Sequence, residues 1–215
     1  MGLLSFFSIV RIAHSTSRYN KSIDVIERFG KKELYVNDIQ QSGPYTIRLW
    51  KNGLVFLQIH YPEKVKKILI LGIGGGTVFP MLHTRFPNAK ITAVDIDSEI
   101  IRLYSNFFSG DSSSYVSLIR ADAQKFVGSE RMNYDLVIVD LYVGNDVPGF
   151  VTGTSFFAAL KNIVSTHGMI IFNYFTDKNQ WAKSQMLLDK LSAIFPFASR
   201  KQNIRNVFYY CGKIG

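Results

Sequence analysis

The stretch ILILGIGGGTV, residues 68–78, is the feature that most constrains how this chain can fold. Four consecutive apolar residues are typical of a strand that is buried on both faces, as in a parallel sheet. The glycines that follow allow a tight turn into a helix and let a ligand approach the main chain without Cβ atoms in the way. The stretch therefore predicts a strand, a glycine loop and a helix of an α/β protein.

The alternation of pattern after residue 65 extends this interpretation to the rest of the chain. Apolar strand-like runs alternate with amphipathic segments, which we expect to be helices over 77–86, 98–108, 123–129, 154–165 and 178–194. Strands too apolar to face water indicate a mostly parallel sheet covered by helices on both sides. The last stretch, SRKQNIRNVFYYCGK, reads as two strands joined by a turn, so the sheet is expected to close with an antiparallel hairpin.

The residues before position 65 have a different pattern. SIDVIERFGKKELYVND alternates apolar and polar residues around Phe29-Gly30-Lys31-Lys32 and predicts a β-hairpin. GPYTIRLWKNGLVFLQIHYP predicts a helix that ends before Pro62. Its apolar residues at helical spacing are Ile47, Trp50, Leu54 and Leu57. We therefore expect an N-terminal segment over residues 1–64 and an α/β domain over residues 65–215.

The opening, MGLLSFFSIVRIAHS, is apolar enough to suggest a signal peptide but lacks the other features of one. It lacks a basic n-region and a small-x-small cleavage site, and Arg11 interrupts it. We expect an element that packs on the core or on a partner. No stretch reaches about 18 uninterrupted apolar residues, so no membrane span is expected.

The composition limits the expected cellular location and binding partners. The only cysteine is Cys211 and the four histidines are scattered, so neither a disulfide within the chain nor a metal site is expected, and a reducing, cytoplasmic location fits best. The net charge is +9, with the basic excess in residues 1–67 and 180–215. This excess leaves nucleic acid open as a partner, although a solvated basic surface explains the same count.

Carboxylates follow three successive predicted strands after the glycine loop. Asp95 stands 23 residues after Gly72, where an acidic side chain can accept hydrogen bonds from both ribose hydroxyls. Asp122 can accept from an exocyclic amino group such as that of adenine, or can simply cap the next helix. Asp140 ends a run too apolar to favour a charge, which makes it the catalytic candidate.

In its ordered motifs the chain resembles the spermidine synthase-like branch of the class I S-adenosylmethionine-dependent methyltransferase superfamily. The matching stretches are LYVNDIQQSG, LGIGGGT, VDID, ADAQKF and VIVD. The resemblance implies a Rossmann-like, seven-stranded class I methyltransferase fold preceded by a small N-terminal β-hairpin. It places Gln41 near the methionine part of the cofactor, Asp95 at the ribose, Asp122 at adenine and Asp140 at the catalytic aspartate.

Three departures from this family's aminopropyltransferases bear on the reaction. Gly75 stands where the GGGDGG loop has an aspartate, Val143 replaces the second acid after the fourth strand, and GPYTIRLW replaces the usual D-E-x-x-Y-H-E stretch. Aminopropyl transfer handles bare ammonium groups that need carboxylates, whereas an aspartate at position 75 would repel the carboxylate of ordinary S-adenosylmethionine. Asn145 or Asp146, a few residues after Val143, is the candidate to replace the missing acid, which keeps aminopropyl transfer open.

The sequence-based hypothesis is a cytoplasmic methyltransferase that binds S-adenosylmethionine, needs no metal and methylates an unidentified acceptor, small molecule or otherwise. Asp140 would orient that acceptor or take its proton, with Tyr142 and Tyr174 as candidate acceptor-side residues or ordinary core aromatics. The cofactor-binding candidates are Gln41, Gly72, Gly74, Gly75, Gly76, Asp95, Asp122 and Ala123.

Three alternatives stay open. A polyamine aminopropyltransferase (spermidine synthase) would use decarboxylated S-adenosylmethionine and putrescine on the same fold. A nicotinamide dehydrogenase would use the same glycines, but Thr77 replaces the last glycine of its fingerprint and Asp122 gains no role. A non-catalytic nucleoside-binding scaffold is the third. Related polyamine enzymes are commonly dimers, so a homodimer is also an expectation, with residues 1–16 as the candidate contact segment.

Overall fold

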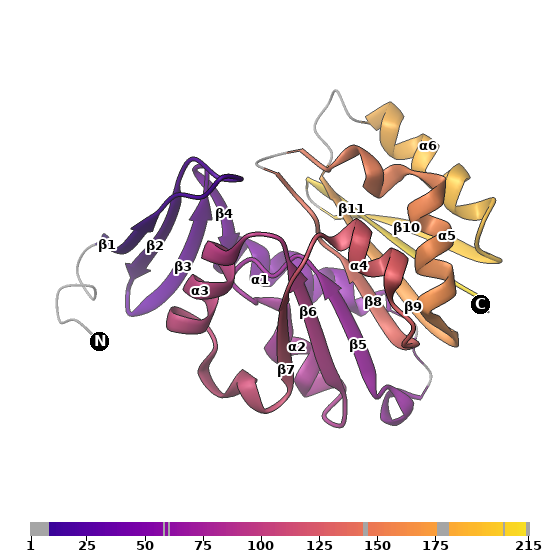
Figure 1. Cartoon of the computed structure of the whole chain (residues 1–215), viewed down its shortest axis with the longest axis horizontal. Coiled ribbons are helices and arrows are strands. Elements are labelled where there is room, and N and C mark those ends of the chain that lie inside the picture. Colours follow the sequence, from indigo (N-terminus) through magenta and orange to yellow (C-terminus); the bar gives the residue numbers. More distant parts are fainter. Residues whose placement is uncertain are drawn as a thin grey trace.

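A computed structural model gives the fold, and it describes residues 9–57, 59, 61–143, 146–175, 181–203 and 205–213. These residues form a four-stranded sheet of order β1-β2-β3-β4 and a seven-stranded sheet of order β10-β11-β9-β8-β5-β6-β7 (Figure 1). The predicted fold class is confirmed.

The N-terminal sheet is larger than the hairpin that the sequence predicts. Its strands are β1 (Ile9–Ser15), β2 (Ile23–Arg28), β3 (Lys31–Val36) and β4 (Ile39–Ser42), all antiparallel to their neighbours. The β2–β3 turn is only Phe29-Gly30, both with positive φ (49° and 70°), which matches the twist of the flanking strands. The apolar opening of the sequence thus continues into an edge strand from Ile9, whereas residues 1–8 lie outside the described part.

The seven-stranded sheet has the predicted arrangement, parallel except for its C-terminal hairpin. The parallel strands are β5 (Lys67–Leu71), β6 (Lys90–Asp95), β7 (Val116–Arg120), β8 (Tyr134–Val139) and β9 (Val164–Phe175). The hairpin is β10 (Phe197–Asn203) and β11 (Asn206–Gly212), with β11 antiparallel to both β10 and β9. After β7 the chain returns to place β8 on the other side of β5, so the order reverses between β5 and β8. Ligands of open α/β sheets bind at such a reversal.

In the described part of the chain, six helices cover the two faces of this sheet. They are α1 (Pro44–Val55), α2 (Val78–Arg85), α3 (Ser98–Phe107), α4 (Ala123–Ser129), α5 (Thr154–Ile163) and α6 (Trp181–Ser192), with short 3-10 turns over Pro62–Lys64, Gly110–Ser114 and Gly149–Thr152. Five of them match the predicted segments closely, although residues 178–180 of the last lie outside the described part. Helix α5 ends at Ile163, and β9 begins five residues before the apolar run MIIF.

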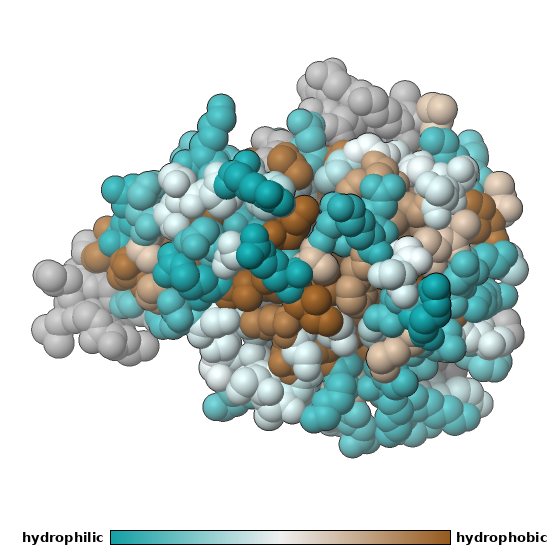
Figure 2. All heavy atoms as spheres, viewed as in Figure 1, coloured by the Kyte–Doolittle hydropathy of each residue, from teal (hydrophilic) through white to brown (hydrophobic). Residues whose placement is uncertain are grey.

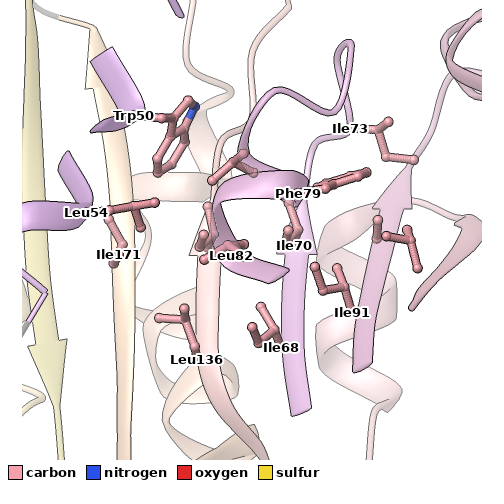
Figure 3. Close-up of a cluster of buried hydrophobic side chains, with 14 of the residues drawn as sticks. Trp50, Leu54, Ile68, Ile70, Ile73, Phe79, Leu82, Ile91, Leu136 and Ile171 are labelled. Carbon is pink, nitrogen blue, oxygen red and sulfur yellow. The ribbon is translucent and has the colours of Figure 1, made fainter. Parts of the chain in front are cut away.

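Alternation along the central strand builds one hydrophobic layer on each face. Ile68 and Ile70 of β5 face the cluster that contains residues of α1, α2 and α3, whereas Leu69 and Leu71 face the cluster of α4, α5 and α6. Figure 3 shows the first layer, where side chains of the strands meet those of α1 and α2: Ile68, Ile70, Ile91, Leu136 and Ile171 against Trp50, Leu54, Phe79 and Leu82. A strand with both faces buried is the structural reason for the run ILIL.

Helix α1 belongs to the N-terminal segment in sequence but packs on the seven-stranded sheet. The Trp50 ring meets the Phe208 ring edge-on at 5.2 Å, and the Tyr210 hydroxyl donates to the Gly53 carbonyl at 2.7 Å. Because Trp50 and Ile68 also share one core cluster with Leu34 of β3, both sheets are built on the same core. The predicted domain boundary between residues 64 and 65 stays a prediction.

The end of α1 differs from the sequence-based expectation. The helix ends at Val55, which is before Pro62 as predicted but also before Leu57, which the spacing had placed on it. The Arg85 guanidinium of α2 donates to the carbonyls of Leu54 (2.5 Å) and Leu57 (2.7 Å) at this end. Ile47, expected on the apolar face, is 40% exposed. Burial lowers the pKa of Arg85 from its ordinary value.

The surface is mixed in character. In the view of Figure 2, hydrophobic residues gather in the middle of the molecule, between the N-terminal sheet and the elements around α4 and α5. Within the described residues, no helix combines the length and the apolar character needed to cross a membrane.

The packing of α1 gives a first prediction. Phe208 is fully buried against Trp50, so Phe208→Ala should lower the free energy of unfolding by about 3–5 kcal/mol through lost apolar contact and a residual cavity. Urea unfolding followed by tryptophan fluorescence measures this change. Met186→Ala, at a position that is 59% exposed, is the control and should change stability by less than about 0.5 kcal/mol. Equal midpoints for both variants would contradict the packing described here.

Candidate functional site

A cavity of about 210 Å³ lies at the carboxyl ends of β5, β6 and β8, with the N-terminal sheet forming its other wall. The N-terminal segment contributes Tyr19, Asn20, Val36 and Gln41. The remaining lining residues are Gly72, Gly74, Val94, Asp95, Ile96, Asp97, Ile100, Asp122, Ala123, Asp140, Leu141, Tyr142, Val143, Pro148 and Phe150. Seven of the nine predicted site residues therefore meet in one cavity; Gly75 and Gly76 do not line it.

The glycines of the loop after β5 have different roles. Gly72 has φ +97°, and a Cβ there would lie 2.1 Å from the Asp140 carbonyl oxygen, so only glycine fits. Gly75 faces Ser42 of β4, where an added Cβ would come within 2.3 Å of the Ser42 Cβ. Gly76 similarly faces the Tyr104 ring. The space beside Gly75 is therefore filled by Ser42.

Asp95 is held in a fixed orientation at the end of β6. Its carboxylate accepts hydrogen bonds from the backbone N–H of Ile73 (3.0 Å) in the glycine loop and of Asp97 (2.9 Å). Burial raises the pKa of Asp95 above its ordinary value, and these N–H donors partly offset the rise. A carboxylate oxygen can accept more than one hydrogen bond, so the group keeps acceptor capacity toward the cavity.

Asp97 is a site residue that the sequence analysis missed. It is 2% exposed, caps α3 by accepting from the Glu99 N–H, and also accepts from Ser17 Oγ (2.5 Å) and Asn20 Nδ2 (2.8 Å). These bonds tie the β1–β2 loop to α3 and so place Tyr19 and Asn20 on the cavity wall. An aspartate directly before a predicted helix, as in DIDSEI, is a helix-cap signal that was visible in the sequence, whereas nothing local marks the loop.

Asp122 fits the helix-cap alternative and lies at the cavity as well. Its carboxylate accepts from the backbone N–H of Lys125 at 3.0 Å, which caps α4. Ala123 follows as a buried residue of the same wall. Helix capping alone thus accounts for one oxygen of Asp122, and its proposed contact with adenine stays a prediction.

Asp140 lies where β8 ends, beside the glycine loop. Its backbone N–H donates to the Leu71 carbonyl at 2.8 Å, and its Oδ1 accepts from Asn173 Nδ2 at 2.8 Å. Burial raises the pKa of Asp140 to about 6, and hydrogen bonds from the Asn173 and Trp50 side chains oppose that rise. Asn173 was also missed, although one polar residue inside the apolar run MIIFNYF was a signal for it.

The two tyrosines named from the sequence lie in different places, one at the cavity and one in the core. Tyr142 lines the cavity, and its hydroxyl donates to the Asn173 carbonyl at 2.9 Å. Tyr174 is on the opposite face of β9, buried edge-on against Tyr209, and is a core aromatic residue. Asp146 is exposed and does not line the cavity, whereas Asn145 lies outside the described residues.

The charges around the cavity are of one sign. Four carboxylates line it, those of Asp95, Asp97, Asp122 and Asp140, and no Lys, Arg or His is among the described residues of the wall. Such a cavity favours a cationic ligand over an anionic one. Among the described residues, no three His, Cys, Asp or Glu side chains are arranged to hold a metal ion.

This arrangement, a glycine loop facing strand-end carboxylates in a class I methyltransferase-like fold, defines the class of the protein. The sequence matches the spermine/spermidine synthase domain over residues 51–208, so the chain belongs to that family. The resemblance noted from the motifs is thereby confirmed.

Individual relatives divide between two reactions. The chain is 25% identical over 192 residues to the probable polyamine aminopropyl transferase of Bifidobacterium longum, covering 89% of this chain and 41% of that protein. It is 26% identical over 159 residues to the human eEF1A lysine and N-terminal methyltransferase, covering 67% and 22%. The chain thus spans less than half the length of either relative. Both groups are transferases, and the family match favours the aminopropyltransferase alternative over the methyltransferase preferred from the sequence.

Solved structures agree on the fold. A probable spermidine synthase from Corynebacterium glutamicum superposes with a TM-score of 0.78 at 16% identity, over 93% of this chain and 79% of that one.

The contact at Gly72 gives a second prediction. Gly72→Ala should lower the free energy of unfolding by more than about 2 kcal/mol, because the new methyl group meets the Asp140 carbonyl and strains a positive-φ backbone. Gly128→Ala is the matched control, since nothing lies within 4 Å of the added carbon and alanine favours a helix. Thermal unfolding of both variants measures the effect, and a Gly72→Ala variant as stable as Gly128→Ala would refute this role of Gly72.

The pKa of Asp140 gives a third prediction. Because folding raises this pKa from 3.8 to about 6, the charged carboxylate costs folding free energy at high pH, and the cost is lost as pH falls from 6 to 4. Asp140→Asn should therefore raise the free energy of unfolding at pH 8 by up to about 3 kcal/mol, with little gain at pH 4. Urea unfolding at pH 8, 6 and 4 tests this, with exposed Asp189→Asn as control. A gain independent of pH would contradict it.

Proposed function

We propose that the chain is an aminopropyltransferase that binds decarboxylated S-adenosylmethionine and transfers its aminopropyl group to a polyamine-type amine. The observation that carries this proposal is that no cationic side chain is among the described residues of the cavity wall, so the carboxylate of ordinary S-adenosylmethionine would find no charged partner there. Decarboxylated S-adenosylmethionine and a polyamine are both purely cationic, whereas ordinary S-adenosylmethionine also brings a carboxylate. The family match and the aminopropyltransferase relative support the same choice.

The residues of the cavity fit a nucleoside sulfonium compound. Asp95, oriented by two backbone N–H groups, would accept from the ribose hydroxyls. Asp122 and Ala123 would lie at adenine, with apolar Leu141 and Phe150 on the same cavity wall. The glycine loop at Gly72 and Gly74 and the side chain of Gln41 would surround the sulfonium end.

Asp140 has the properties that an amine acceptor requires. The sulfonium supplies an electrophilic carbon when bound, and the nitrogen that attacks it must first be neutral. With a pKa of about 6, the carboxylate is ionised at neutral pH, orients an ammonium by charge and takes the proton that the amine gives up. The proton then passes to solvent.

Methyl transfer is the second candidate, and two observations favour it. Val143 and Gly75 stand where aminopropyltransferases of the family carry acids, and Ser42 fills the space at Gly75. The similarity to the human eEF1A methyltransferase points the same way. In that case backbone N–H groups of the glycine loop would have to hold the methionine carboxylate, because the described wall offers it no cation.

A binding and product experiment distinguishes the candidates. Calorimetric titration with S-adenosylmethionine, its decarboxylated form and NADH should show at least about tenfold tighter binding of the decarboxylated form, which corresponds to 1.4 kcal/mol. Incubation with putrescine should then yield 5′-methylthioadenosine and spermidine. Tighter binding of S-adenosylmethionine would favour methyl transfer instead. Tighter binding of NADH would overturn both aminopropyl transfer and methyl transfer.

Asp140→Asn provides the control for the chemical step. The variant should bind the decarboxylated compound within about threefold of the wild type but lose turnover by at least about 100-fold. Asp189→Asn, at an exposed position on α6, should keep both. Tight binding without turnover in the wild type would favour a nucleoside-binding scaffold instead.

A further inference from the structure

Asp140 is the end of a chain of hydrogen bonds that crosses four elements. The Tyr45 hydroxyl of α1 donates to Asn206 Oδ1 of β11 at 2.9 Å, and Asn206 Nδ2 donates to Asn173 Oδ1 of β9 at 2.8 Å. Asn173 Nδ2 then donates to Asp140 Oδ1 at 2.8 Å. Every donor in the chain points toward the carboxylate, so each bond polarises the next in the direction that stabilises a negative charge.

Both amides of this chain are buried. Asn173 is 7% exposed and Asn206 is 4% exposed, and Asn173 lies inside the apolar run MIIFNYF of β9. A buried amide contributes little net stability even when its hydrogen bonds are made, and it is costly when they are not. Two such groups side by side in a sheet are therefore better explained by what they do to Asp140 than by the stability of the fold.

The orientation of Asn173 is determined by its partners. Its side-chain oxygen accepts from Asn206 and its side-chain nitrogen donates to Asp140, so rotating the amide by 180° would lose both bonds. Its backbone carbonyl accepts from the Tyr142 hydroxyl at 2.9 Å. These three hydrogen bonds hold the Asn173 side chain in one orientation, and Asn173 in turn holds the Asp140 carboxylate.

We propose that Asn173, Asn206 and Tyr45 are positioning residues that hold the Asp140 carboxylate in one rotamer and keep it ionised in spite of its burial. Tyr45 and Asn206 act through Asn173, which alone of the three hydrogen-bonds Asp140, and Asn206 also hydrogen-bonds Tyr142. We call the chain of hydrogen bonds from Tyr45 through Asn206 and Asn173 to Asp140 the relay. Its catalytic meaning rests on the proposed role of Asp140, whereas its effect on the Asp140 carboxylate does not.

The other groups that face Asp140 do not replace this relay. Trp50 of α1 is a further hydrogen-bonding partner, and Tyr142 stays neutral because burial and the charge of Asp140 raise its pKa well above the ordinary value. The remaining carboxylates of the cavity are Asp95, Asp97 and Asp122. At the Tyr45 end of the hydrogen-bond chain, burial raises the pKa of Tyr45 by more than the charges of Arg205 and Arg48 lower it. The Tyr45 hydroxyl therefore remains a neutral donor.

The C-terminal hairpin contains a matched control for this relay. Asn203 donates to the Leu49 carbonyl at 2.9 Å and accepts from Asn52 at 3.2 Å, so it also joins the hairpin to α1. It is 7% exposed, close to the 4% of Asn206. Asn203 thus shares the docking role and the burial of Asn206 but has no hydrogen bond in the chain that leads to Asp140.

The decisive experiment is an NMR titration of the Asp140 side-chain carboxyl carbon, assigned by its loss in Asp140→Asn. Removing a donor should disfavour the ionised form, so Asn206→Ala should raise the pKa of Asp140 by roughly 0.5 or more, and Tyr45→Phe by a smaller amount in the same direction. Asn203→Ala should leave this pKa unchanged. A Tyr45→Phe variant, which loses only one partly buried hydroxyl, keeps the test available if Asn206→Ala does not fold.

The outcomes separate the relay from the proposed function. Equal titrations in wild type, Tyr45→Phe and Asn206→Ala would overturn the relay even if the protein transfers aminopropyl groups, and so would an equal rise in Asn203→Ala. If the pKa moves as expected without any turnover, the relay stands and the proposed function fails. If the protein is active, kcat of Asn206→Ala with putrescine should fall at least about fivefold with its acid limb displaced to higher pH, while KM for the sulfonium compound stays within about twofold.

Discussion

The contact between Gly72 and the Asp140 carbonyl is the constraint on which the site depends. Strands β5 and β8 are neighbours at the point where the strand order reverses. The residues that directly follow them, Gly72 and Asp140, lie close together before the two loops separate. Any side chain at Gly72 would force these ends apart. Because they stay together, the glycine loop and the buried carboxylate of Asp140 open onto one cavity. In the proposed reaction, this is where the electrophile and the Asp140 base would meet.

The electrostatics of that cavity come from residues that also build the fold. Asp97 caps α3 and ties down the β1–β2 loop, and Asp122 caps α4. Their charges are stabilised by backbone N–H donors, so an acidic wall can exist without nearby cations. This explains how a chain with net charge +9 presents a negative cavity. The basic residues that dominate its flanks lie elsewhere than on the described wall.

Segments from both ends of the chain complete the environment of Asp140. Helix α1 brings Trp50 and Tyr45, and the C-terminal hairpin brings Asn206, through contacts between residues more than 150 positions apart. The departures from the family's acidic motifs at Gly75 and Val143 therefore do not describe the whole site. Its four carboxylates lie in the stretches VDID, ADAQKF and VIVD, whereas the hydrogen-bond partners of Asp140 lie in distant segments that no local motif contains.

The sequence by itself determined the parallel sheet, the glycine turn and the carboxylates at the strand ends, because hydrophobic periodicity and turn chemistry are local properties of the chain. It also located Gln41, Asp95, Asp122 and Asp140, which the fold brings to one cavity. Only the tertiary structure decided that Gly75 and Gly76 pack against Ser42 and Tyr104, and that β1 and β4 enlarge the N-terminal sheet. The contacts of Asp140 with Asn173 and Trp50, and the place of Tyr19 and Asn20 on the cavity wall, likewise emerged only in three dimensions. The physical reason is that these contacts join residues far apart in the sequence, and their energies depend on distance and burial, neither of which a linear pattern contains.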